Sequence, residues 1–297
     1  MSMKAPELRR TWLFGPGAHR PTHEAMARSG ADGLILDLED FTPPDLRAQA
    51  RQDLAQVAQM WRDAGALVCI RINQLETEGP QDLEAAMRGG ADVIGYPMAK
   101  SGEQMRHLDA AITAWEERLQ RPLGSTEIMP VCETALGVVA VREMAAASPR
   151  VRSALLGAED LANDLCAERE PDAVELDYAR RRFVLECRAA GIEPIDAPFT
   201  YGDVQGAVNE GVYARRLGYR SKSLVRPEHA QPLNEVFTPS ADALKRAQGL
   251  VSAFEAARAQ GDDRALFEGQ WVEVPTYRNA RRLIERARQL NAIHQHD

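Results

Sequence analysis

The chain has 297 residues, of which 44% are hydrophobic and 27% are charged. These are ordinary values for a globular protein, so the composition permits a sizeable core and excludes a disordered chain. The formal net charge of −8 argues against nucleic acid as a partner, because phosphate binding normally leaves a basic footprint.

The sequence has no pattern typical of a secretory signal, a membrane span or a disulfide framework. Residues 1–10 are polar and charged and lack the apolar centre of a secretory signal. No apolar run approaches the roughly 20 residues that a membrane span needs. The cysteines form no CxxC pair, so we expect buried free thiols at Cys69, Cys132, Cys166 and Cys187. The prediction is a cytoplasmic protein without a membrane partner.

Short apolar runs alternate with longer helical segments from one end of the chain to the other. Most runs are rich in Leu, Ile or Val and end at Gly, Pro, Asn or an acidic residue, as buried parallel strands do. The expected strands cover residues 11–14, 33–38, 67–72, 93–96, 127–132, 154–157, 194–197 and 222–225. The expected helices include residues 47–64, 81–89, 103–120, 137–147, 178–190 and 207–217.

This alternation predicts a (β/α)₈ TIM barrel over residues 1–230. An open doubly wound sheet is the alternative, but the glycine-rich GxGxxG turn typical of that fold is missing from the sequence. Residues 231–297 exceed the needs of the barrel and predict a C-terminal extension, with helices at 241–258 and 277–290. The stretch FEGQWVEVP between them is expected to be a loop or a short strand. The extension either packs on the barrel or reaches a neighbouring subunit.

Acidic residues gather where the expected strands end. Strand 33–38 runs into Asp37, Glu39 and Asp40, strand 127–132 into Glu133, and strand 154–157 towards Asp160. In such a barrel these strand ends share one rim, where several carboxylates would repel each other unless a cation lay among them. Glu133 and Asp160 follow adjacent strands, and Mg²⁺ commonly binds one or two carboxylates. Helix capping is the open alternative for Glu39 and Asp160.

One arginine, Arg71, ends the third expected strand and would lie on the same rim. Its planar guanidinium suits a substrate carboxylate. A buried ion pair with Asp37 or Glu39 is the open alternative. Glu39 and Asp40 are expected to orient Arg71 or metal-bound waters from behind the metal ligands.

Six segments spread over nearly the whole chain carry a recognisable pattern: RTWLFGPGAHRP, ADGLILDLEDFTPP, CIRIN, CETALGV, AASPRVRSALLGAEDLANDL and NEVFTPS. Together, and in this order, they resemble the citrate lyase β-subunit-like group of the HpcH/HpaI aldolase family. The resemblance implies Mg²⁺, with Mn²⁺ as a possible substitute. It also implies cleavage or formation of a carbon–carbon bond in a hydroxyacyl-CoA such as citryl-, malyl- or citramalyl-CoA, with a keto acid as the second product.

The resemblance also implies individual roles. Glu133 and Asp160 match the family's metal ligands, and Arg71 matches the arginine that binds the substrate carboxylate. Phe14 and Arg20 match positions near the CoA-thioester end. Backbone N–H groups near Ala158 and Glu159 would complete the substrate cradle.

Three positions depart from the family pattern. Met98 stands where the family commonly has a lysine, and Arg226 stands where it often has a histidine. Glu273 stands where malyl-CoA-type relatives have an aspartate that the neighbouring subunit delivers. Arg226 is expected to contact substrate and to alter which acid is accepted. A surface or interface residue is the open alternative for Arg226. Glu273 would exchange the proton on the acyl carbon. The resemblance favours a homotrimer.

Two other functions remain open at this stage. One is an aldolase that releases pyruvate from a hydroxy-keto acid without CoA. The other is a subunit that binds a keto acid without catalysis, which the departures at Met98, Arg226 and Glu273 keep open.

Overall fold

The computed structural model describes residues 3–294, and its contacts divide the chain into two compact units, Met1–Asn234 and Glu235–Asp297. In the described residues no helix is both long and apolar enough to cross a membrane.

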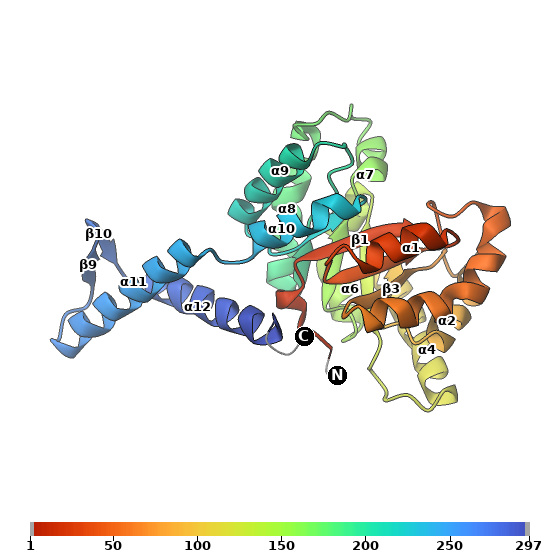
Figure 1. Ribbon diagram of the computed structural model, residues 1–297, viewed down its shortest axis with the longest axis horizontal. Helices are drawn as coiled ribbons and strands as arrows, with labels where there is room; N and C mark the ends of the chain where they lie inside the picture. The colour runs from red at the N-terminus through yellow and green to blue at the C-terminus, as the bar shows by residue number, and fades with distance from the viewer. Residues whose placement is uncertain (1–2, 295–297) are drawn as a thin grey trace. The chain divides into compact units, whose positions relative to one another are not determined.

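Eight parallel strands form the centre of the first unit (Figure 1). Sheet neighbours follow chain order, β1 also pairs with β8, and a bridge between Asp196 and Lys222 joins the end of β7 to β8. The sheet therefore closes into the predicted (β/α)₈ barrel. The strands are β1 (Thr11–Pro16), β2 (Gly33–Asp37), β3 (Leu67–Arg71), β4 (Val93–Tyr96), β5 (Glu127–Cys132), β6 (Ser153–Leu156), β7 (Glu193–Ile195) and β8 (Lys222–Leu224).

Helices follow the strands, mostly where the sequence predicts them. They are α1 (Arg20–Ala27), α2 (Arg47–Asp63), α3 (Gly79–Arg88), α4 (Gly102–Arg118), α5 (Ala135–Val139), α6 (Val141–Ala147), α7 (Glu159–Asp164), α8 (Asp177–Ala190), α9 (Val204–Leu217) and α10 (Ala230–Phe237). Short 3₁₀ helices are η1 (Pro6–Leu8), η2 (Pro44–Leu46), η3 (Val174–Leu176) and η4 (Pro227–His229). The prediction of a single helix over 137–147 is wrong. The segment forms two helices, α5 and α6, because the backbone at Ala140 departs from helical geometry, with φ −88° and ψ −1°.

Chain reversal before two strands depends on glycine. Gly191 and Gly218 end α8 and α9 with φ of 74° and 109°. This left-handed backbone is accessible to glycine without a Cβ clash, so glycine suits both helix ends.

Apolar side chains from the strands fill the barrel interior, including Trp12, Ile35, Val93, Met129, Leu155 and Ile195. Three cysteines are buried as expected. The expectation is wrong for Cys166, which is exposed in the turn after α7.

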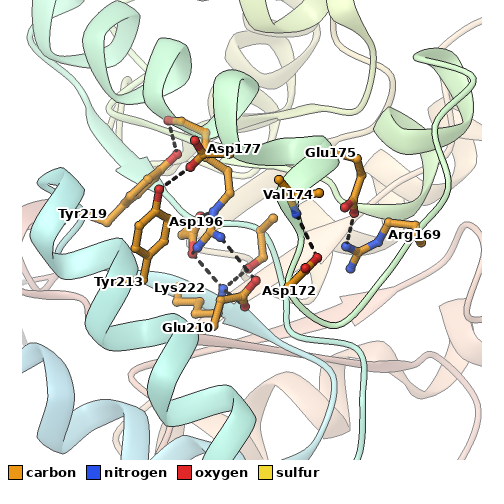
Figure 2. A network of polar contacts seen from close by, with 12 residues as sticks. Arg169, Asp172, Val174, Glu175, Asp177, Asp196, Glu210, Tyr213, Tyr219 and Lys222 are labelled. Carbon is orange, nitrogen blue, oxygen red and sulfur yellow. Dashed lines mark hydrogen bonds and ion pairs between the residues drawn. The ribbon is translucent and has the colours of Figure 1, made fainter.

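The seam between β7 and β8 is held by a buried ionic network, which we call the seam network: Arg180, Asp196, Glu210 and Lys222 (Figure 2). Lys222 is fully buried, and its Nζ lies 2.7 Å from both Asp196 Oδ2 and Glu210 Oε2. Arg180 donates to both oxygens of Asp196, at 3.0 Å and 2.7 Å. Burial alone would raise the pKa of Asp196, but the charges of Arg180 and Lys222 lower it.

The second unit pairs helices α11 (Ala241–Ala259) and α12 (Val274–His294), with an antiparallel hairpin of β9 (Ala265–Phe267) and β10 (Gln270–Val272) between them. Ser240 caps α11 by accepting the N–H of Ala243 at 3.2 Å. Phe254 stacks on Tyr277 with ring centroids 4.7 Å apart and packs with buried Ala265 and Val272. The stretch FEGQWVEVP is therefore largely this hairpin.

Candidate active site at the carboxyl ends of the strands

The acidic residues lie at the carboxyl ends of neighbouring strands. Asp37 ends β2 and stands opposite Arg71, which ends β3. Glu133 directly follows β5, and Asp160 lies in the first turn of α7 after β6. We call this set, with Glu39 and Asp40 of the loop after β2, the acidic rim. Because all these strands are parallel, they present these side chains at one end of the barrel.

Arg71 is buried at the centre of the acidic rim. Its Nε donates to Asp37 Oδ1 at 2.8 Å, and its Nη2 donates to Asp37 Oδ2. Its Nη1 donates to Glu133 Oε1 at 3.1 Å and lies 3.0 Å from Glu39 Oε2. Burial would lower the pKa of Arg71, but Asp37, Glu133 and Glu39 raise it above its usual value. The ion pair that the sequence left open is therefore present. The edge of the guanidinium formed by Nε and Nη2 faces Asp37.

Glu133 is held from two sides and is 4% exposed. Its Oε2 accepts the backbone N–H of Met98 at 2.9 Å, and Met98 has a left-handed backbone with φ of 48°. On the other side, a Cβ added to Gly157 would lie 2.4 Å from Glu133 Cγ, so only glycine leaves room for this side chain. Burial raises the pKa of Glu133 to about 7, with Asp160 and Asp40 adding to the effect.

The remaining acids reinforce this negative environment. Burial raises the pKa of Glu39 to about 8, and the charges of Glu133, Asp40 and Asp37 act in the same direction. Burial and the charge of Asp40 also raise the pKa of Asp160. Five carboxyl groups thus share one guanidinium, that of Arg71. This imbalance is what a bound cation would relieve.

The donor set fits a magnesium ion. Within residues 3–294, no three His, Cys, Asp or Glu side chains converge into a ready-made metal cage. Glu133 and Asp160 instead offer two carboxylates, one buried and one exposed. Mg²⁺ is commonly bound in this way, since it retains several waters and takes its remaining ligands from substrate.

Two aromatic rings lie beside Arg71. Its Cζ is 5.2 Å from the ring centroid of Phe14 and 6.0 Å from that of Phe41. The two rings contact each other with centroids 5.9 Å apart. Phe14 is buried, whereas Phe41 is 41% exposed at the rim. The position expected near the thioester end therefore contacts the arginine directly.

Two other expected site residues, Arg20 and Arg226, pair with acids outside the acidic rim. Arg20, on α1, is exposed and pairs with Glu24 at 3.1 Å. Arg226 follows β8, pairs with Glu228 at 3.6 Å, and packs towards Gly202 in the loop before α9. Glu273 lies in the second unit between β10 and α12 and is exposed. Its role in the site stays a prediction.

The start of α7 carries the remaining expected groups. Ala158 is buried at the N-cap position, and Glu159 is the first helical residue. The side chain of Glu159 accepts from Thr200 and contacts Arg169.

Several residues around the site were not singled out from the sequence. Phe41 directly follows the acidic run, and that position could have drawn attention to it. The partnership of Asp37 with Arg71 was weighed only as an alternative. The Met98 amide and Arg169 had no local signal, because their contacts join segments 35 and 10 residues apart.

Comparisons with known proteins agree with this geometry. Residues 10–227 match the sequence model of the HpcH/HpaI aldolase/citrate lyase family. The citrate lyase subunit beta of Leuconostoc mesenteroides subsp. cremoris is 34% identical over 294 residues, covering 98% of this chain and 96% of that protein. An L-malyl-CoA/beta-methylmalyl-CoA lyase of Cereibacter sphaeroides is 30% identical over 308 residues, covering 95% of this chain and 96% of that one.

A solved structure shows the same relationship. Protein CitE from Mycobacterium tuberculosis, in complex with magnesium, acetoacetate and coenzyme A, superposes with a TM-score of 0.74 at 27% identity. The match covers 94% of this chain and 97% of that one. The chain therefore belongs to the HpcH/HpaI aldolase/citrate lyase family.

Proposed function

We propose that this protein is a Mg²⁺-dependent carbon–carbon lyase. It cleaves, or forms, a 3-hydroxyacyl-CoA such as citryl-, malyl- or citramalyl-CoA, giving an acyl-CoA and a keto acid. The observation that carries the proposal is the acidic rim, in which five carboxyl groups share Arg71. The names of the relatives, and the magnesium and coenzyme A bound to CitE, support the same chemistry.

Glu133 and Asp160 would hold the ion. When bound, Mg²⁺ supplies a Lewis acid next to the oxygen that changes between hydroxyl and keto forms. Arg71 would orient the substrate carboxylate through Nη1, in place of its contacts with Glu133 and Glu39, because Asp37 occupies the Nε–Nη2 edge. The backbone N–H groups of Ala158 and Glu159 complete that cradle.

The cleavage step needs two proton movements. The hydroxyl proton passes to solvent water as the C–C bond breaks, and the electron pair of that bond moves to the carbon next to the thioester. That carbon then takes a proton, a role we assign to the carboxyl group of Glu273. Synthesis runs through the same steps in reverse.

The periphery would set which substrate enters. Phe14 and Arg20 are assigned to the thioester end, and Arg226 to the choice of acid. Glu39 and Asp40 orient Arg71 and metal-bound waters. These roles can be separated by measuring kcat and KM for each variant.

Assembly is part of the proposal, because Glu273 belongs to the second compact unit. We propose a homo-oligomer, with a trimer favoured, in which Glu273 serves a neighbouring active site. Mixing Glu273→Ala with Arg71→Ala protein should then restore activity, since one site per pair would hold both wild-type residues. Mixtures as inactive as their components would contradict this sharing.

The direct test is a cleavage assay on citryl-, malyl- and citramalyl-CoA with and without Mg²⁺, using Glu133→Gln as a size-matched control. We expect release of a keto acid that requires both the metal and Glu133. Pyruvate release from a CoA-free hydroxy-keto acid would favour the aldolase instead. Metal-dependent binding of keto acid without turnover of any thioester would favour a non-catalytic subunit.

A further inference from the structure

The loop between α7 and η3 contains an arginine that ties three segments together. Arg169 is largely buried, with 14% of its side chain exposed. Its Nη1 lies 2.6 Å from Glu175 Oε1, and its Nε lies 3.4 Å from Glu159 Oε1. Figure 2 draws the contact between Arg169 and Glu175. Its guanidinium carbon is 6.0 Å from the ring centroid of Tyr201, in the loop before α9.

Glu159 receives a second donor on the same oxygen. The hydroxyl of Thr200 donates to Glu159 Oε1 at 3.0 Å. Two neighbouring loops therefore hold one carboxylate oxygen, although the Glu159 side chain is 58% exposed. An exposed glutamate without such contacts would sample many rotamers, because its side chain has high conformational entropy.

These contacts matter because Glu159 is next to Asp160, the expected metal ligand. Glu159 immediately precedes Asp160 in the first turn of α7. Adjacent residues on a helix point in different directions. The two carboxylates stay apart while Glu159 keeps its observed rotamer, because its long side chain could otherwise turn towards Asp160. Glutamate has a long side chain, and a released Glu159 would bring a sixth negative charge to the acidic rim.

We propose that Arg169 is a positioning residue that holds Glu159 away from the metal position, so that Asp160 alone of this acidic pair serves as a ligand. The proposal rests on the proposed function, because it assumes that Asp160 binds Mg²⁺. Thr200 assists by donating to the same oxygen. Arg169 thereby reserves the remaining coordination positions for substrate and water.

This role predicts opposite changes in metal and substrate binding. In Arg169→Ala, the lost positive charge and the released Glu159 should make Mg²⁺ bind about two- to fivefold more tightly, as expected for a partly exposed charge pair. The KM for the thioester substrate should rise, because Glu159 competes for positions that the substrate uses. A purely structural defect would weaken metal binding instead.

The experiment measures Mg²⁺ affinity by calorimetry on the full chain without substrate, alongside KM in the assay. Arg169→Lys keeps the charge and should restore wild-type affinity. In the Glu159→Gln background, Arg169→Ala should change Mg²⁺ affinity by less than about half as much as in the wild type, because its target has lost its charge. Thr200→Val should shift affinity in the same direction as Arg169→Ala, by a smaller factor, and it tests the idea if Arg169→Ala misfolds.

The outcomes separate this inference from the proposed function. Unchanged or weaker Mg²⁺ binding in Arg169→Ala, or an equal effect with and without Glu159, would overturn the positioning role. Asp160→Asn is the reference variant. If it binds Mg²⁺ as tightly as the wild type, the metal site itself is wrong, whatever Arg169 does.

Discussion

Two ionic groups in the same barrel differ in their charge balance. The seam network sets Arg180 and Lys222 against Asp196 and Glu210, and the charges of its two cations lower the pKa of Asp196. The acidic rim sets five carboxyl groups against Arg71 alone, and burial raises the pKa of both Glu133 and Glu39.

The difference separates a structural role from a functional one. Buried charges that are fully paired hold the fold together, and loss of one partner leaves the other stranded. Buried charges of one sign destabilise the folded chain by themselves, so they indicate a site in which a ligand completes the balance. Substitutions in the two groups should therefore change stability in opposite directions.

The largest effect on stability is expected at the seam. Lys222→Met should lower the free energy of unfolding by about 3–5 kcal/mol, because it leaves Asp196 and Glu210 buried with too little positive charge. Urea unfolding followed by circular dichroism measures this. The exposed Lys100→Met is the control and should stay within about 0.5 kcal/mol of the wild type. Equal stability of the two variants would show that the seam network is dispensable.

The rim substitution should separate function from stability. Glu133→Gln should weaken Mg²⁺ binding at least about a hundredfold, since loss of a direct ligand exceeds the effect of losing a supporting residue. Without metal at pH 8, its free energy of unfolding should equal or exceed that of the wild type, because an unfavourable buried charge is gone. Thermal unfolding with and without Mg²⁺ tests both parts. A marked loss of metal-free stability would refute the charge imbalance.

Stability of the metal-free protein should depend on pH through the same groups. An unperturbed glutamate has a pKa of 4.5, whereas Glu133 and Glu39 have pKa values of about 7 and about 8 in the folded chain. The folded chain therefore holds more protons than the unfolded chain between these values, and its stability falls as the pH rises from about 5 to 8. A decrease of several kcal/mol is expected, because each unit of pKa difference between the folded and unfolded chain corresponds to about 1.4 kcal/mol.

Two buried histidines oppose this pH effect, and the Glu133→Gln variant isolates the contribution of Glu133. His23 and His229 have lowered pKa values, caused mainly by burial, and act in the opposite direction below about pH 6.5. Glu133→Gln should therefore show a shallower fall than the wild type, and saturating Mg²⁺ should flatten the wild-type curve. Identical pH profiles for the wild type and the variant would contradict the prediction.

The smallest effect on stability is expected at Arg20. Its pair with Glu24 is exposed and lies one helical turn away, so Arg20→Ala should change the free energy of unfolding by less than about 0.5 kcal/mol. If Arg20 contacts the thioester end, KM should rise while kcat stays near the wild-type value. An unchanged KM would remove Arg20 from the site.

The alternation of apolar runs and helices is enough to predict the barrel and the edge that bears its acids. Eight apolar runs, each followed by helical periodicity, have few other ways to bury both faces of a parallel sheet. Because parallel strands end on one side, the order of residues in the chain already places Asp37, Glu133 and Asp160 at a common rim. The break at Ala140 and the exposure of Cys166 were missed, since both depend on packing of neighbouring elements.

The pairing of the charged side chains follows only from the folded barrel. Arg71 can bind Asp37 or an incoming carboxylate equally well in sequence terms, and strand register places it opposite Asp37. The partners Lys222 and Asp196 are 26 residues apart. Arg169, in the loop after α7, and Glu159, at the start of α7, are 10 residues apart. Local patterns carry information about burial and periodicity over a few residues. Ion pairing depends on side-chain distances between segments, which exist only once the barrel has closed.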